Sequence, residues 1–215
     1  MLEEGGPRRS PVMSGDVSDW QALVDRVNIG LPVVYPTSNL PALGCIPTSD
    51  ALNLLFALKQ RGHDMVVSLA VADLEQASEI VAVPKQARQL FEDFPPSSLT
   101  LILPALKTLD SRVGGDSIAI RIITTKTSRK LLTEVGPLTA TSANISGVNP
   151  VADCQEAAEA LGIESFIAGT CSNEPPTTLI RCDDYATLTS GEQLQVLREG
   201  MISQKEVNSW SMKMI

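Results

Sequence analysis

Short apolar runs rich in β-branched residues recur along this chain, and in its first half they alternate with stretches of helical periodicity. Runs at 31–36, 65–71, 98–104 and 117–123 are bounded by proline, glycine or polar residues, which is typical of buried strands. Helical patterns precede and separate them, whereas strand patterns dominate the second half of the chain. This order predicts an α/β domain with a mixed sheet.

The ends of the chain differ from its middle. Residues 1–16 are rich in Gly, Pro, Arg and Ser without periodicity and predict a flexible tail, 17–203 form the domain, and 204–215 predict a tail or short helix. The first residues lack the apolar stretch of a signal peptide, and no run of about eighteen apolar residues follows. We therefore expect a cytoplasmic protein without membrane association.

Three local predictions can be compared directly with the structure. Ser18 followed by Gln21 predicts a capping box at the start of the first helix. Gly62 fits the position just past the end of the second helix. The run SFIAG at 165–169 predicts a short strand, followed by strands at 177–182 and 194–199.

Several common catalytic sites are excluded by counting. The four cysteines, Cys45, Cys154, Cys171 and Cys182, form no CxxC pair, and His63 is the only histidine. This argues against a zinc finger, a thioredoxin-like site and a metalloprotease, and makes a Ser-His or Cys-His nucleophile improbable. We expect buried thiols and a surface imidazole. The chain also lacks the GxxxxGK[ST] phosphate loop and a GxGxxG turn after a strand.

Lys59 and Arg61 stand two residues apart at the end of a predicted helix, in LKQRG. Residues two apart on a helix face different directions, but unwinding at Gly62 would let both cations converge on one anion. A lysine point charge and an arginine fork together suit a polyphosphate. The alternative is that both cations only complement the negative end of the helix dipole.

Polar side chains gather in two further stretches. ATSANISG at 140–147 follows a strand, and PTSNLPALG at 36–44 lies between two apolar strands. Because ligands of open α/β sheets bind at strand ends, both stretches could contact a small substrate, although both could equally be ordinary turns. Arg198 lies on an otherwise apolar strand, where it reaches a cleft or stays exposed at its rim.

Taken in order, these segments resemble the YrdC-like family, the threonylcarbamoyl-AMP synthases of transfer-RNA modification. The resemblance covers about residues 18–203. Its most specific element is KxR, Lys59 and Arg61, followed by SxN, Ser142 and Asn144. Supporting matches are PT (36–37), LG (43–44), SLTLIL (98–103), AIR (119–121) and LREG (197–200).

The resemblance implies a single twisted α/β domain with a deep basic cleft. Such enzymes condense L-threonine, bicarbonate and ATP into threonylcarbamoyl-AMP and release pyrophosphate, and a threonylcarbamoyl transferase complex then modifies tRNA. This chemistry needs cations and alignment rather than a protein nucleophile. ATP would bring Mg²⁺ held largely by phosphates and water, so no metal site made of protein side chains is expected.

The resemblance also implies roles for individual residues. The catalytic pair would be Lys59 and Arg61. ATP would contact Lys59, Arg61, Thr100, Ser142, Asn144 and Arg198, and threonine would contact Thr37, Asn39, Arg121 and Thr177. The first loop departs from the family, because it reads PTSNLPA where PTDTVYG is usual.

Two other functions remain open. The first is a non-catalytic RNA-binding protein with weak affinity for RNA, although a net charge of −8 and an aromatic content of 4% disfavour it. The second is a nucleotide-binding relative with a different acceptor, which the altered first loop suggests.

Overall fold

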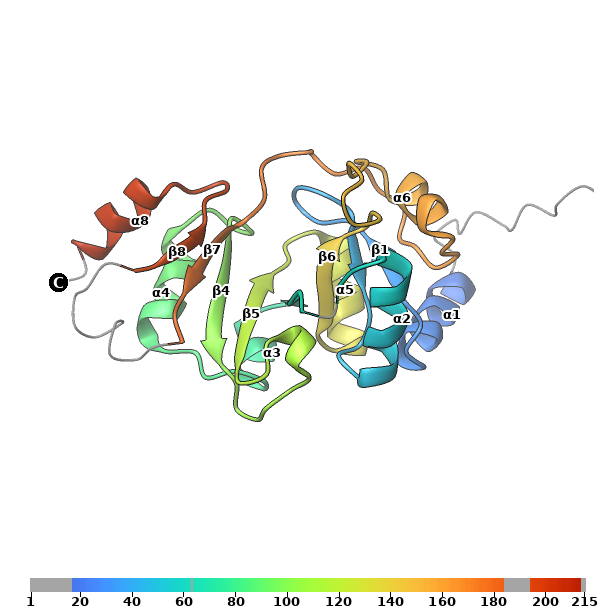
Figure 1. The fold of residues 1–215 in the computed structure, drawn as a ribbon, viewed down its shortest axis with the longest axis horizontal. Coiled ribbons are helices and arrows are strands. Elements are labelled where there is room, and N and C mark those ends of the chain that lie inside the picture. The colour runs from blue at the N-terminus through green and yellow to red at the C-terminus, as the bar shows by residue number, and fades with distance from the viewer. Residues whose placement is uncertain (1–16, 63, 184–193, 214–215) are drawn as a thin grey trace, which may run out of the picture.

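An eight-stranded sheet organises the described part of the chain. The computed structural model describes residues 17–62, 64–183 and 194–213 (Figure 1). The predicted tail at 1–16 and His63 lie outside the described residues. The strands are β1 (Val33–Tyr35), β2 (Ala42–Gly44), β3 (Ser68–Val71), β4 (Leu99–Pro104), β5 (Ser117–Ile122), β6 (Leu138–Ser142), β7 (Thr178–Arg181) and β8 (Val196–Arg198).

The order of the strands is β1-β2-β6-β3-β5-β4-β7-β8. The pairs β3–β5 and β4–β7 are parallel, and the other neighbours are antiparallel. The predicted mixed α/β sheet is therefore confirmed. The helices are α1 (Val17–Asn28), α2 (Ser49–Lys59), α3 (Leu74–Ser78), α4 (Lys85–Asp93), α5 (Lys126–Val135), α6 (Cys154–Leu161) and α8 (Gln204–Ser211), with a 3₁₀ turn at Ser111–Val113.

Two helix ends differ from prediction. Helix α1 begins at Val17, so Ser18 lies inside the helix rather than at its cap. Helix α2 ends one residue earlier than a helix with Gly62 just past its end would. Gln60 takes the left-handed conformation (φ 50°), and its N–H donates to carbonyls of the last turn. A helix can end on a non-glycine residue in this way at a modest cost in backbone strain.

The predicted strand at 165–169 is wrong. Only one bridge forms there, between Val34 and Phe166, through backbone hydrogen bonds from Val34 N to Ser165 O (3.0 Å) and from Ile167 N to Val34 O (2.8 Å). Strand β1 is three residues long, so it offers too short an edge to extend that pairing.

The two faces of the sheet are covered by different helices. Residues of α1 and α5 pack with Val33 and Leu138 in one cluster, and residues of α2 and α6 pack with Val34 and Leu69 in another. Helix α8 begins with a capping box between Ser203 and Glu206, and Trp210 Nε1 donates to Asp93 at the end of α4 (2.7 Å). Of the two alternatives for the end of the chain, a tail or a short helix, the structure has a short helix that contacts α4.

A segment without regular structure, residues 172–177, connects the α6 side of the fold to β7 and is called the strap below. In Figure 1 it belongs to the orange trace that arches over the strands between α6 and β7. All four cysteines are free and buried, as predicted. None of the described helices has the length and apolar character needed to cross a membrane.

Candidate functional site

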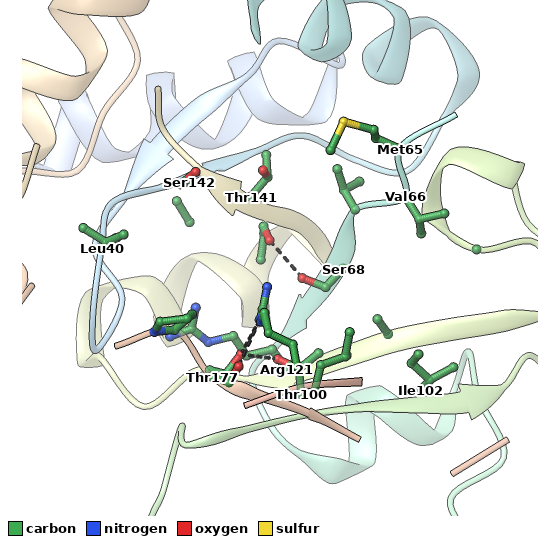
Figure 2. A pocket seen from close by; sticks show the side chains of 18 of the residues that line it. Leu40, Met65, Val66, Ser68, Thr100, Ile102, Arg121, Thr141, Ser142 and Thr177 are labelled. Carbon is green, nitrogen blue, oxygen red and sulfur yellow. Dashed lines mark hydrogen bonds between the residues drawn. The ribbon is translucent and has the colours of Figure 1, made fainter. Parts of the chain in front are cut away.

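A cleft of about 630 Å³ lies on one face of the sheet. Its floor consists of alternating residues of the central strands, including Ser68 on β3, Ala119 and Arg121 on β5, and Thr100 on β4. Figure 2 shows Thr141 and Ser142 on one side of this pocket and Thr100, Arg121 and Thr177 on the other. Two groups of polar residues therefore face each other across the cleft.

The first polar group is built around Lys59, the last residue of α2. Its side chain is 2% exposed, and its Nζ donates to the main-chain carbonyl of Asn144 (2.7 Å) and to that of Ser142. Ser146 N in turn donates to Lys59 O (2.9 Å), which fixes the loop after β6 against the helix end. An ammonium has three donors, so one remains for a ligand.

Arg61 and the loop after β6 complete this group. The guanidinium of Arg61 donates to Val66 O (2.9 Å) and lies 3.5 Å from Thr141 Oγ1, while its buried Nε has no partner among the described residues. Asn144 Nδ2 donates to Val148 O (2.6 Å), and its buried Oδ1 also lacks a described partner. Buried polar atoms without a protein partner are positions where water or a ligand can complete the hydrogen bonds.

The second polar group surrounds Arg121 on β5. Its Nη2 donates to Asn39 Oδ1 (2.6 Å), Ser38 Oγ (3.0 Å) and Thr37 Oγ1 (3.2 Å), and its buried Nε has no partner within the described residues. Thr177 lies beside it on the strap. The hydroxyls of Thr100 and Thr177 are 2.6 Å apart, and Arg198 Nη2 donates to Thr177 O (2.9 Å).

Four cations of the site have no carboxylate partner among the residues that the structure describes. Among the described residues, none of Lys59, Arg61, Arg121 and Arg198 forms an ion pair. Burial lowers the pKa of Lys59 to about 8, with a further lowering by the nearby charge of Arg61. Burial likewise lowers the pKa of Arg121 to about 10. Uncompensated buried cations are costly, so the site is suited to an anionic ligand.

An apolar wall flanks the cations. Met65 and Val66 line the cleft and are 47% and 50% exposed, and Ile102 and Leu179 line it from β4 and β7. Exposed apolar side chains beside buried cations suit a ligand with a flat apolar part and a charged part. A nucleoside polyphosphate has this composition.

The structure brings the sequence-predicted residues together. Seven of them line the cleft: Asn39, Arg61, Thr100, Arg121, Ser142, Thr177 and Arg198. The other three lie directly behind it, since Lys59 and Asn144 meet through the loop after β6 and Thr37 contacts Arg121.

Sequence reasoning missed Arg181 and Ser38. Arg181 lines the cleft and lies 3.8 Å from Asp183 in an ion pair, and it alternates with Leu179 along β7. That two-residue alternation was the available signal. Ser38 contacts Arg121, but no pattern around it distinguishes it from the other polar residues of its loop.

The site offers few ligands for a metal ion. Within the described ranges, no three His, Cys, Asp or Glu side chains gather into a group that could hold one. Asp183 is the carboxylate that lines the cleft, and it pairs with Arg181. Hydroxyl and backbone carbonyl oxygens are the other protein oxygens along the described lining of the cleft.

Nucleotide binding should weaken at alkaline pH. The pKa of Lys59 is about 8 rather than its ordinary 10.5, so the ammonium is present below about pH 8 and is lost above it. A bound polyphosphate favours the ammonium, so the dissociation constant of ATP should rise above pH 8 by up to about tenfold per pH unit. Calorimetric titration from pH 7 to 9.5 measures this. A flat profile would mean that Lys59 does not meet the phosphates.

Comparison with known proteins identifies the family. The model of the Sua5/YciO/YrdC family, which is described as telomere recombination, matches residues 26–200. A Vibrio cholerae protein named threonylcarbamoyl-AMP synthase is 32% identical over 194 residues, covering 86% of this chain and 98% of that protein. A Vibrio parahaemolyticus protein of the same name is 29% identical and covered completely.

Solved structures agree. The crystal structure of P. abyssi Sua5 complexed with L-threonine is similar, with a TM-score of 0.78 and 25% identity over 89% of this chain, and this chain spans 57% of that one. E. coli YciO has a TM-score of 0.71 and 27% identity, with 87% of this chain and 91% of that chain covered. The family match over most of the chain shows that this protein belongs to the Sua5/YciO/YrdC family.

Proposed function

We propose that this chain is a threonylcarbamoyl-AMP synthase, which condenses L-threonine, bicarbonate and ATP and releases pyrophosphate. The observation that carries the proposal is a cleft with two facing polar groups whose four cations have no described carboxylate partner. The names of the Vibrio relatives and the threonine complex of P. abyssi Sua5 support the same reaction.

In this proposal the first polar group binds the triphosphate. Lys59 has one N–H beyond its two bonds to carbonyls, and Arg61 and Ser142 line the cleft. These donors would hold the phosphates and offset the charge that develops on them. The base would lie against Met65 and Val66.

The second polar group would bind threonine. Arg121 would attract the carboxylate by its charge, and Thr100 and Thr177 would supply hydroxyls beside it. The charge of a buried guanidinium acts more strongly on a nearby carboxylate than the charge of a solvated one. Arg198 contacts Thr177 of the second group and lines the cleft, from where it would reach the nucleotide.

The proposed reaction has two steps that balance. The amine of threonine attacks bicarbonate to form a carbamate, and water leaves. A carbamate oxygen then attacks the α-phosphorus of ATP, and the bond to the bridging oxygen breaks so that pyrophosphate departs. Two anions must approach each other, so the contribution of this chain is to align them and to reduce their repulsion with Lys59 and Arg61. Mg²⁺ bound to the triphosphate would neutralise further charge.

The product would pass to a threonylcarbamoyl transferase that acts on tRNA, and we propose a cytoplasmic location where ATP and tRNA are available. RNA binding by this chain itself is not part of the proposal. Arg61, Arg121 and Arg198 line the cleft rather than a broad outer surface, and the net charge of −8 disfavours an extended contact with phosphates.

The proposal predicts that pyrophosphate release requires all three substrates. Omitting threonine or bicarbonate should lower the rate at least tenfold, and among the twenty amino acids L-threonine should give the highest rate. A coupled pyrophosphate assay measures this. Release that is stimulated best by another amino acid would replace threonine as the acceptor, and release that needs no amino acid would overturn the proposal.

A further inference from the structure

Asn39 is almost fully buried, with 4% of its surface exposed, although it lies on a loop beside the cleft. Its Oδ1 accepts hydrogen bonds from Arg121 Nη2 (2.6 Å) and Thr37 Oγ1 (2.9 Å). Its Nδ2 lies 3.4 Å from Pro175 O, and its backbone carbonyl accepts from Asn173 N (2.8 Å). The polar groups of Asn39 are thus turned toward the protein rather than toward a ligand.

These contacts connect two separate parts of the site. One is the guanidinium of Arg121, which Asn39 holds by the Nη2 edge together with Thr37 and Ser38. The other is the strap. Its Asn173 N donates to the backbone carbonyl of Asn39, its Pro175 O accepts from Asn39 Nδ2, and its Thr177 lines the cleft. Asn39 therefore links a cation to the segment beside it: its side chain contacts Arg121 and Pro175 O, and its backbone carbonyl contacts Asn173.

The choice of an amide matters for charge. Three neutral oxygens hold Nη2, so the guanidinium is fixed while its positive charge stays available. A carboxylate at the same position would hold the guanidinium equally well but would neutralise it. An alanine would leave the charge and remove the shortest of the three contacts.

We infer that Asn39 is a positioning residue for the amino-acid substrate, which holds Arg121 in place without neutralising it and anchors the strap, rather than a direct contact of threonine. This inference rests on the proposed function and deepens it. It assigns the altered first loop a role in binding the carboxylate of the substrate.

The test compares Asn39→Ala and Asn39→Asp with the wild type in the pyrophosphate assay. We expect the KM for threonine to rise at least tenfold in both, while the KM for ATP stays within about threefold. Asn39→Asp keeps an acceptor for Arg121 Nη2 but removes the Nδ2 donor that faces Pro175 O. The melting temperatures of both variants are therefore measured, and KM is compared only at temperatures at which each variant is folded. The exposed Asn28→Ala at the end of α1 is the matched control and should behave as the wild type.

A double-mutant cycle separates positioning from direct contact. If Asn39 acts through Arg121, Asn39→Ala should have little further effect on the threonine KM in an Arg121→Lys background. An undiminished effect there would mean that Asn39 acts independently of Arg121, by direct contact or through the strap, and would overturn its assignment as the residue that positions Arg121.

The remaining outcomes are distinct. A threonine KM within threefold of wild type in both Asn39 variants would sink the inference while leaving the proposed function standing. A wild-type protein that needs no threonine would remove both.

Discussion

Replacing Lys59 with methionine should reduce the affinity for ATP by about 10- to 100-fold and reduce pyrophosphate release at least as much. Methionine keeps the apolar stem in its buried position and removes the ammonium. Loss of a hydrogen bond to a charged group costs about 1.5–3 kcal/mol, which corresponds to this range. Isothermal titration with ATP and the pyrophosphate assay measure the two effects.

The exposed Lys107→Met is the control for general effects of losing a cation. The melting temperature of Lys59→Met should also be recorded, because the carbonyls of Ser142 and Asn144 lose their donor. A variant that is destabilised but binds ATP within threefold of wild type would show that Lys59 only holds the loop after β6. In that case the first polar group would not be a phosphate site.

The fold could be predicted wherever burial and backbone pattern agree. The runs that gave β4 and β5 are rich in Leu and Ile and largely buried, so their apolar character predicts the sheet. The run at 65–71 forms a strand only from Ser68, because Met65 and Val66 are 47% and 50% exposed beside the cleft. The run at 165–169 has a similar composition and forms one bridge. Composition shows that a segment can pair, but the length of the partner edge decides whether it does.

The site could be predicted in its residues better than in its geometry. KxR suggested convergence after unwinding at Gly62, but the turn occurs at Gln60, and Lys59 is directed by the carbonyls of Ser142 and Asn144. Those carbonyls belong to a loop more than eighty residues away in sequence. The local sequence around Lys59 cannot predict this contact. The SxN motif identifies the loop that provides the carbonyls, but not their contact with Lys59.

Asn39 illustrates the same limit. As a substitution in the first loop it suggested a changed contact with threonine, but the structure turns its amide toward Arg121 and the strap. Polar residue types identify a loop as functional, and burial decides which of them face the ligand.

Gly200→Ala should lower the free energy of unfolding by about 2–4 kcal/mol and the melting temperature by roughly 5–15 °C. A Cβ at this position would lie 1.9 Å from Pro176 O and 2.8 Å from the carbonyl carbon of Thr177. Both are backbone atoms of the strap and cannot rotate away. Met201 N donates to Pro176 O (2.9 Å), and Gly200 N donates to Thr178 Oγ1 (3.1 Å), so a shift breaks the contacts that hold β8 against β7.

The sign of this effect is informative, because chain entropy alone predicts the opposite. Gly200 does not have a left-handed φ, and alanine at an unstrained glycine usually stabilises a protein by about 0.4–1 kcal/mol. Gly136→Ala is the control: its φ is +85° and its Cβ would meet nothing within 4 Å, so it should show backbone strain without a clash. Thermal unfolding of both variants and the threonine KM of Gly200→Ala measure the outcome. Because Arg198 and Thr177 meet beside this contact, any Gly200→Ala protein that folds should bind both substrates weakly, and a stable, fully active variant would show that the strap is free to move away from β8.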